Sequence, residues 1–387
     1  MKPAVIVVGG GVVGAATAWS LAREGVDALL LEARRFGRRS TGVSAAIVRC
    51  HYSNAEVVRM AVRSRETLRR LPLLLECEPV YHRTGWLFLV DEADAELAVR
   101  NAEMQEAEGV DSVDVDDLEE LLPGVRQEGI AYALFEPDSG FADPVATTEA
   151  YVAAFRREGG EAREEAPVEA IEVSRGRVRG VRVGGELVEC GIVVLAAGPW
   201  SLPLARTAGL ELPLEITREQ DVIFATGPEP GVPCAVSSQV DRVYLRPAVE
   251  HGPGHVLAGR GFPKAYERVD PDRFDERVDE TFERDLHERV AGRLPRLAGM
   301  RAAGGRVGLY DVTPDWHPLL GPAGEPENLV LATGGSGHCF KLAPAIGELV
   351  AAQIVGSGVP YADAASFSLE RFAAGRTFVS TYGGNRA

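Results

Sequence analysis

The first 32 residues hold the feature that most constrains the fold, a glycine turn between an apolar strand and a helix. A strand is predicted at 4–8, an alanine-rich helix at 12–23 and a second strand at 28–31, which ends in Glu32. Glycines spaced Gly-x-Gly-x-x-Gly in a βαβ unit let a pyrophosphate approach the helix N-terminus, and the acid accepts hydrogen bonds from a ribose. We therefore predict a dinucleotide site; the alternative is an ordinary tight turn. The residues predicted to form the dinucleotide site are Gly9, Gly11, Val12, Val13, Gly14, Glu32, Ala33 and Arg34.

The composition narrows the class of partner. The 387 residues are 45% hydrophobic and 25% charged, as in soluble globular proteins of two domains. A formal charge of −16 disfavours nucleic acid and anionic lipid, so we expect a small-molecule partner. The five cysteines lack Cys-x-x-Cys spacing, and the apolar run at 4–8 is too short to span a membrane. We expect a cytoplasmic protein without a metal site.

The rest of the chain mixes helical and strand patterns. Helices are predicted at 53–75, 91–108, 144–157, 273–289 and 343–355. Strands are predicted at 85–90, 170–183, 192–196, 222–224, 243–245 and 329–332. The middle of the chain differs in composition from its flanks, which favours a second domain inserted into the first.

Two more glycine turns follow predicted strands. One is LAAGPW at 195–200, and the other is TGGSGH at 333–338, which precedes a helix. The first motif alone does not distinguish FAD from NAD, but a simple nicotinamide enzyme has no need of three such turns.

Four separated blocks carry a resemblance to a known family: STGVSAAIVRCHY at 40–52, LAAGPW at 195–200, TPDWHPLLG at 313–321 and GGSGHCFK at 334–341. With the first glycine turn, the chain resembles the FAD-dependent D-amino acid oxidase superfamily, in its sarcosine oxidase and glycine oxidase branch. The resemblance covers nearly the whole chain. It implies an α/β plus α+β fold, with a Rossmann-type FAD-binding domain (1–75, 145–213 and 310–387) and an inserted, mostly antiparallel β-sheet substrate domain (76–144 and 214–309).

The resemblance also implies a reaction. A small amino acid or N-alkyl amino acid would be oxidised at its CH–NH bond by hydride transfer to flavin N5, the imine would hydrolyse, and O2 would be reduced to H2O2. Arg49 and Lys341 match the cations that hold the substrate carboxylate, for which a guanidinium fork is suited. The alternative for Arg49 is a structural ion pair with a local acid, and the role of Lys341 stays open.

Further cofactor contacts come from the same resemblance. Val168 would contact the adenine through its backbone; the alternative is a buried strand residue. The turn at 335–338 would stabilise negative charge on the reduced flavin; the alternative is an ordinary helix cap. The residues assigned to the cofactor are Ser40, Thr41, Ser44, Ala45, Ala46, Val168, Ala197, Gly198, Trp200, Gly308, Gly334, Gly335, Ser336, Gly337, His338 and Lys341.

The chain departs from the family pattern at three places. Gly308 stands where monomeric sarcosine oxidases bond the flavin to a cysteine, so we expect noncovalent FAD. Cys339 stands at a position where the family usually has glycine, and we expect its thiol to be buried and unreactive. The oxygen-activating lysine has no evident match near 259–261, and Lys264 comes a few residues late.

The missing lysine keeps other functions open. One is a dehydrogenase, alone or as a subunit of a heteromeric complex, that oxidises proline, an opine, an N-methyl amino acid or a 2-hydroxy acid and passes electrons to a quinone or protein. Another is a flavoprotein partner without catalysis. A homo-oligomer is also possible on the sequence alone.

Overall fold

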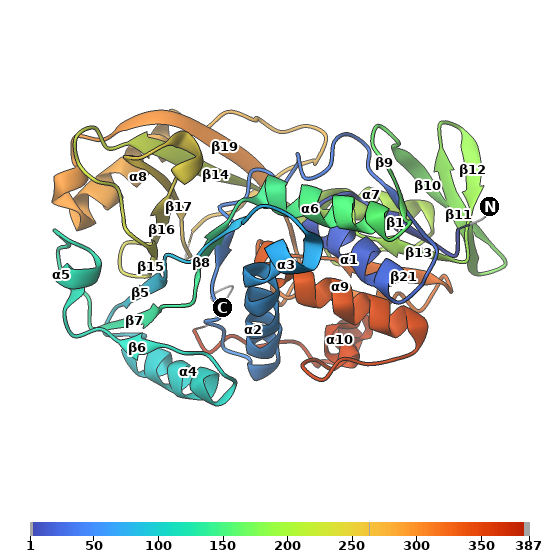
Figure 1. Ribbon diagram of the computed structural model, residues 1–387, viewed down its shortest axis with the longest axis horizontal. Coiled ribbons are helices and arrows are strands. Elements are labelled where there is room, and N and C mark those ends of the chain that lie inside the picture. Colours follow the sequence, from blue (N-terminus) through green and yellow to red (C-terminus); the bar gives the residue numbers. More distant parts are fainter. Residues whose placement is uncertain (1–2, 263, 383–387) are drawn as a thin grey trace.

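Two sheets of different design form the body of the molecule (Figure 1). The computed structural model describes residues 3–262 and 264–382. One sheet is mainly parallel and the other mainly antiparallel, so the fold is the predicted combination of α/β and α+β. The division of the chain into two domains at the residues given above stays a prediction.

The mainly parallel sheet has six strands in the order β20-β21-β13-β1-β2-β9. Only β20 is antiparallel to its neighbour. The sequences VIVV, IVVL and ALLL of the central strands are continuously apolar because both faces are covered. The strands are β1 (Val5–Val8), β2 (Ala28–Leu31), β9 (Glu161–Arg163), β13 (Ile192–Leu195), β20 (Leu319–Pro322) and β21 (Leu329–Thr333).

Helices cover one face of this sheet and a small sheet covers the other. Val5, Val7 and Leu30 pack with residues of α1 (Val12–Arg23), α6 (Pro144–Arg157) and α9 (Cys339–Val355). The alternate residues of β1 and β2 pack on the opposite side, in keeping with the period of two along a strand. Their partners there are β10 (Val168–Ser174), β11 (Arg177–Val183), β12 (Glu186–Glu189) and α7 (Ser201–Thr207).

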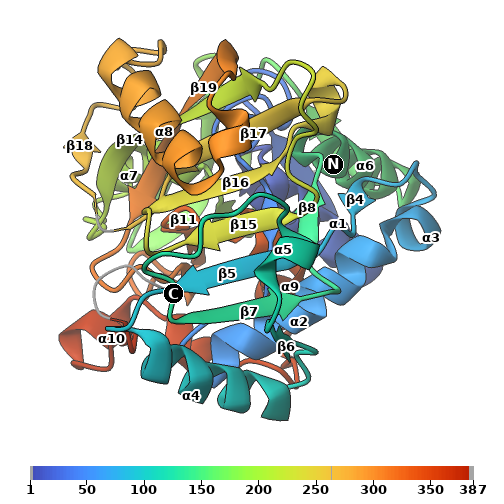
Figure 2. The ribbon, with the colours of Figure 1, turned by 90° about the vertical axis from the view of Figure 1, so that its left-hand side faces the viewer.

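The second sheet has nine strands and is antiparallel except between β5 and β15. Figure 2 shows β17, β16, β15, β5 and β7 side by side, in the order that the strand pairing gives. The strands are β5 (Trp86–Val90), β6 (Val113–Asp114), β7 (Tyr132–Glu136), β14 (Glu215–Ala225), β15 (Ala235–Ser238), β16 (Val243–Pro247), β17 (His255–Arg260), β18 (Glu267–Arg268) and β19 (Arg301–Val312).

The two faces of the second sheet have different roles. Leu87 and Leu89 of β5 pack in one cluster with Leu286 and Val290 of α8 (Glu280–Arg293). Trp86, Phe88 and Val90 point the other way and belong to a separate cluster. Helix α5 (Leu118–Leu121) packs with the α8 side.

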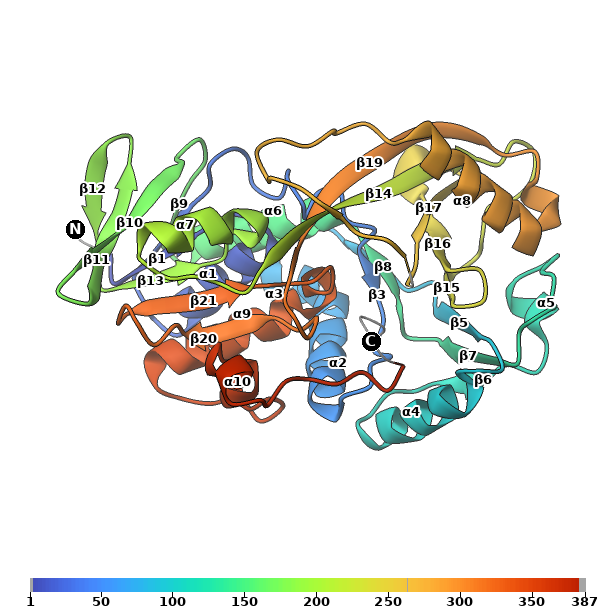
Figure 3. The same cartoon turned by 180° about the vertical axis from the view of Figure 1, so that it is seen from behind.

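A small sheet and two helices lie between the two large sheets, while α4 (Ala95–Ala107) lies beside the second sheet and α10 (Glu370–Ala373) beside the parallel one (Figure 3). A small sheet of β3 (Ile47–Val48), β8 (Gly140–Ala142) and β4 (Tyr81–His82) stands beside α2 (Ala55–Arg69) and α3 (Leu71–Leu75). Helix α4 packs on β5 and β7, and α10 follows the 3-10 turn Ala364–Phe367. In the described part of the chain, no helix has the length and apolar character needed to cross a membrane.

Several predicted elements are confirmed and a few are wrong. The helices at 12–23 and 144–157 and the strand at 28–31 have the predicted bounds. The helix predicted at 53–75 is interrupted at Arg70, just before Pro72, and the last long helix begins at Cys339 instead of 343. Strand β19, which contains Gly304 and Gly305, was not predicted.

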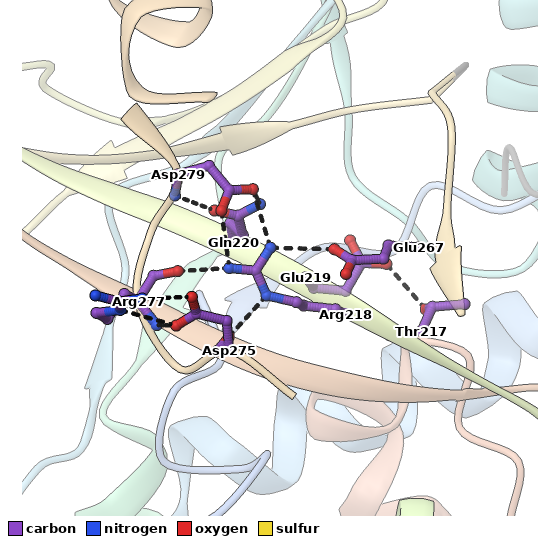
Figure 4. A network of polar contacts seen from close by, with 8 residues as sticks. All are labelled: Thr217, Arg218, Glu219, Gln220, Glu267, Asp275, Arg277 and Asp279. Atoms are coloured by element: carbon purple, nitrogen blue, oxygen red, sulfur yellow. Dashed lines mark hydrogen bonds and ion pairs between the residues drawn. The ribbon is translucent and has the colours of Figure 1, made fainter. Parts of the chain in front are cut away.

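The helix predicted at 273–289 begins only at Glu280. Figure 4 shows the reason: the guanidinium of Arg218 is hydrogen-bonded to backbone carbonyl oxygens that would accept the hydrogen bonds of a helix. Arg218 donates to the carbonyl oxygens of Asp275 and Arg277 at 2.7 and 2.5 Å and to the carboxylate of Asp279. Its side chain is 2% exposed, so these bonds fix residues 275–279 as a loop against β14.

Candidate active site

A cavity of ≈1200 Å³ opens at the carboxyl ends of the parallel strands. Strands β1, β2, β13 and β21 end at residues 8, 31, 195 and 333, and the residues that follow each of them line the cavity. Ligands of open parallel sheets bind at this edge. The three glycine turns of the sequence thus meet at one site.

The first turn forms one end of the cavity. Gly9 has φ +110, and a Cβ atom on Gly14 would overlap the carbonyl oxygen of Gly9. Helix α1 begins directly behind the turn with Gly11 as its N-cap, which has no side chain to cap it, and of the first-turn N–H groups that of Val12 donates to Thr41 Oγ1 at 3.3 Å. Its free N–H groups and the positive end of its dipole suit a pyrophosphate. The residues present therefore fit the diphosphate of FAD.

Glu32 is fixed at the rim of the same cavity. Its Oε2 accepts from the Gly10 N–H at 2.7 Å and its Oε1 from the Arg34 N–H at 2.8 Å. The half-buried carboxylate keeps lone pairs for ribose hydroxyls, so this acid fits the adenosine half of the cofactor.

Most of the residues predicted to bind the cofactor line this large cavity. Among them are Gly9, Gly11, Val12, Val13, Glu32, Ala33, Arg34, Ser40, Thr41, Ser44, Ala45, Val168, Ala197, Gly198, Trp200, Gly308, Gly335 and Gly337. Six others do not line it. Ala46, Ser336, His338 and Lys341 line a second, smaller cavity, and Gly14 and Gly334 lie behind the walls as packing positions.

The smaller cavity has a volume of ≈220 Å³ and adjoins the larger one. Both are lined by Ser44, Ala45, Tyr244, Tyr310, Gly337 and Phe340, so these residues stand at the junction. Arg49 and Lys341 line only the smaller cavity. The cations predicted to bind a substrate are thus brought together beside the cavity predicted to hold the flavin.

Neither cation has an acidic partner within the described ranges 3–262 and 264–382, where no carboxylate oxygen lies within 4.0 Å of Arg49 or Lys341. The Arg49 guanidinium instead lies 4.7 Å from the ring centroid of Tyr52 and donates from Nη1 to the His51 carbonyl oxygen. Burial and then the charge of Arg49 lower the pKa of Lys341 to about 7. Two cations without a counter-ion in a small cavity suit an anionic ligand.

Aromatic side chains form much of the small cavity. Trp86 and Phe88 of β5 lie on one side, and Tyr244, Tyr266, Tyr310 and Trp316 lie around the rest. The Tyr244 hydroxyl donates to Asp221 Oδ1 at 2.5 Å, and burial raises the pKa of Asp221 to about 6. A ligand of this cavity therefore needs a compact apolar part next to its anionic group.

Lys264 also lines the small cavity, but its ammonium group forms an ion pair with Glu219. Glu219 lies on β14 opposite Gly308 and lines the large cavity. Three residues after Lys264, Glu267 of β18 accepts from Arg218 in the network of Figure 4. Arg260, the one cation at 259–261, pairs with Asp285.

The third glycine turn is held by a buried acid. Asp311 Oδ2 accepts from the Gly334 N–H at 2.6 Å and from the Thr333 hydroxyl at 3.0 Å, and burial raises the pKa of this carboxyl. Helix α9 begins at Cys339 without a side-chain cap, and Gly337, Cys339 and Phe340 line the large cavity. Its N-terminus can stabilise negative charge that develops on a flavin.

Part of the site had no signal in the sequence. Glu219, Asp221, Tyr244 and Asp311 line the large cavity, yet the strands predicted at 222–224 and 243–245 include only Tyr244, and no strand was predicted around Asp311. The aromatic wall of the small cavity was also missed, because its members lie far apart in sequence. Within residues 3–262 and 264–382, no group of three His, Cys, Asp or Glu side chains is arranged to hold a metal ion.

Known proteins resemble the chain over nearly its whole length. A glycine oxidase of Pseudomonas putida is 29% identical over 96% of this chain and 99% of its own. A monomeric sarcosine oxidase of a Bacillus species is 26% identical over 95% of both chains. The crystal structure of L-proline dehydrogenase from P. horikoshii superposes with a TM-score of 0.88 at 26% identity, and covers 97% of this chain and 99% of that one.

The family profile agrees with the geometry of the large cavity. The profile described as "FAD dependent oxidoreductase" matches residues 4–353, a range that includes all three glycine turns and both cavity-lining cations. The predicted family is confirmed: the chain belongs to the DAO family of FAD-dependent oxidoreductases.

Proposed function

We propose that the protein oxidises the CH–NH bond of a small amino acid or N-alkyl amino acid bound in the small cavity. The observation that carries the proposal is the pair of cations, Arg49 and Lys341, that face this cavity without an acidic partner among the described residues. The names of the related glycine oxidase, sarcosine oxidase and L-proline dehydrogenase agree with such a substrate.

The chain's own groups orient the substrate. The carboxylate pairs with the Arg49 guanidinium and the Lys341 ammonium, since both donate hydrogen bonds and carry charge. The apolar part of a small substrate then faces the aromatic wall, and its reactive carbon points to the junction at Ala45, Tyr244 and Tyr310. No side chain is assigned as a general base, because the amine is proposed to react in its neutral form.

FAD, when bound in the large cavity, supplies the ring that accepts a hydride. The protein contributes the N-terminus of α9, whose first residues Cys339 and Phe340 line the cavity and whose dipole favours the added negative charge. We also propose that FAD is held without a covalent bond, because Gly308 lines the cavity where a cysteine is expected in covalent relatives.

The acceptor of the electrons is O2 in the principal proposal. A dehydrogenase that passes electrons to another acceptor is the second candidate, and one observation favours it. The cations nearest the expected position of an oxygen-activating lysine, Arg260 and Lys264, are both paired with carboxylates. A paired cation contributes less positive potential to superoxide formation than a free one.

The carboxylate clamp is tested by Arg49→Met, which keeps much of the side-chain length and removes the charge. We expect the apparent KM for the best amino acid to rise about tenfold or more with bound FAD unchanged, since one charge-assisted hydrogen-bonding group is lost. Arg177→Met is the matched control, because Arg177 is exposed, lies on β11 of the small three-stranded sheet and lines neither cavity. An unchanged KM in Arg49→Met would rule the clamp out.

A further inference from the structure

The last described residues of the chain form a strap that reaches from the parallel-sheet side to the second sheet. We define the C-terminal strap as residues 378–382. The Phe378 ring stacks on His317 with centroids 4.3 Å apart, and its N–H donates to Asp315 Oδ2 at 3.2 Å. In Figure 3 this red segment runs from α10 past α2 toward the sheet that contains β5 and β7. The strap therefore links the parallel-sheet side of the molecule to the second sheet.

Tyr382 ends the strap behind the aromatic wall of the small cavity. Its side chain is 2% exposed and belongs to one cluster with Trp86, Phe88 and Val90 of β5. The ring centroids of Phe88 and Tyr382 are 6.3 Å apart. Because Trp86 and Phe88 line the cavity on their other side, Tyr382 backs the wall without lining the cavity itself.

The hydroxyl of Tyr382 is linked to the carboxylate clamp through His51. Its Oη lies 2.7 Å from His51 Nε2, and His51 is 1% exposed. Burial and then the charge of Arg49 lower the pKa of His51 to about 3, so the ring stays neutral. The carbonyl oxygen of His51 accepts from Arg49 Nη1. Tyr382, His51 and Arg49 thus form a continuous chain of contacts.

We propose that Tyr382 is a positioning residue for Arg49: by holding His51, it fixes the His51 carbonyl that orients the guanidinium toward a bound carboxylate. The inference rests on the proposed function, since it needs a carboxylate ligand in the small cavity. A guanidinium with a fixed orientation loses less conformational entropy when its ligand binds. The strap is then part of the binding site, although it touches no ligand.

A second set of contacts, which lies away from the cavity, also holds the strap in place. Asn101 of α4 donates from Nδ2 to Thr381 Oγ1 at 2.8 Å, and the Thr381 hydroxyl donates to Ser53 Oγ at 3.0 Å. Asn101 is buried and lines neither cavity. It therefore offers a way to loosen the strap while the clamp and its neighbours keep their side chains.

The test measures binding of acetate, a carboxylate without an amine, to the FAD-loaded protein by calorimetry and by the change in flavin absorbance. Tyr382→Phe removes only the hydroxyl, and we expect the acetate Kd to rise about three- to tenfold, the effect of one lost hydrogen bond. Tyr132→Phe is the matched control, because its hydroxyl bonds Asp114 at 2.5 Å and Tyr132 lines neither cavity. We expect its Kd to equal that of the wild type.

Two further variants separate positioning from general weakening. Asn101→Ala should raise the acetate Kd in the same direction by a smaller factor. His51→Asn lacks Nε2, so its effect and that of Tyr382→Phe should not add in the double variant if both act through one contact. Additive effects would overturn the inference.

The outcomes distinguish this inference from the proposed function. Equal acetate Kd values in the wild type and Tyr382→Phe, both saturable, would overturn the positioning role and leave the clamp standing. No saturable acetate binding by the wild type would overturn the clamp, and the positioning role with it. A Kd raised in Tyr382→Phe but not in Tyr132→Phe, with equal FAD content and thermal unfolding in the two variants, would support the positioning role.

Discussion

The ammonium group of Lys341 shares the small cavity with the guanidinium group of Arg49, and burial and the charge of Arg49 together lower its pKa to about 7. Among the described residues no carboxylate forms an ion pair with either cation, although the buried Glu136 interacts electrostatically with Arg49. A bound carboxylate would relieve the repulsion between the two cations and favour the charged form of Lys341.

A pH dependence of anion binding follows from this pair. Lys341 is protonated below about pH 7 in the free protein, so the acetate Kd should rise as pH increases from about 6 to 8. We expect a change of about three- to tenfold, because the protonated fraction of a group with a pKa of about 7 falls about tenfold between pH 6 and 8. Lys341→Met should bind acetate weakly at every pH, without this rise.

Asp221 provides the control for that experiment. Burial raises its pKa to about 6, so its ionisation also adds negative charge near the junction of the cavities over this range. Asp221→Asn should keep the rise in Kd that centres near pH 7. If the rise disappears in Asp221→Asn and persists in Lys341→Met, the assignment to Lys341 is wrong.

One added methyl group in the first glycine turn should lower the affinity of the protein for FAD. Gly14→Ala would place a methyl group against the Gly9 carbonyl oxygen, so the turn must shift away from the helix. A strain of about 1–3 kcal/mol corresponds to a FAD Kd raised roughly 5- to 150-fold. Fluorescence titration of the apoprotein with FAD measures it. Gly292→Ala, on α8 with no atom within 4 Å of the new methyl, should match the wild type.

If FAD is held without a covalent bond, it should be released when the protein unfolds. Gly308 carries no side chain where it lines the large cavity, and burial raises the pKa of the Cys339 thiol, which disfavours the nucleophilic thiolate. Acid precipitation should therefore leave all FAD in the supernatant. Flavin fluorescence that stays with the precipitated chain on a denaturing gel would contradict this expectation.

A buried ion pair predicts a large effect on stability. Arg371, 0% exposed, donates to both oxygens of Asp315 at 2.8 Å and to the His317 carbonyl. Arg371→Met leaves a buried carboxylate without its partner, which costs about 3–5 kcal/mol, whereas loss of the exposed pair in Arg177→Met costs at most about 1 kcal/mol. Urea unfolding compares the two variants. Equal midpoints would show that Asp315 finds another partner.

The parts of the fold that the sequence predicted are those set by local patterns. The turn at Gly9–Gly14 needs only nearby residues, and the family blocks located Arg49 and Lys341, which the structure brings to one cavity. The helix predicted at 273–289 failed because Arg218, far away in sequence, binds the backbone of that segment. Tyr382 and Glu219 carry no local signal, since their surroundings come from long-range packing.

The central claim is that an amino acid bound at Arg49 and Lys341 reduces FAD in the adjoining cavity. Anaerobic mixing of the FAD-loaded protein with glycine, sarcosine, proline and D- and L-amino acids, followed at about 450 nm where oxidised flavin absorbs, tests it most directly. We predict bleaching by at least one of them, greatly slowed in Arg49→Met. After air is admitted, fast recolouring with peroxide would identify an oxidase, and slow recolouring a dehydrogenase. No bleaching by any of these compounds would contradict the proposed function.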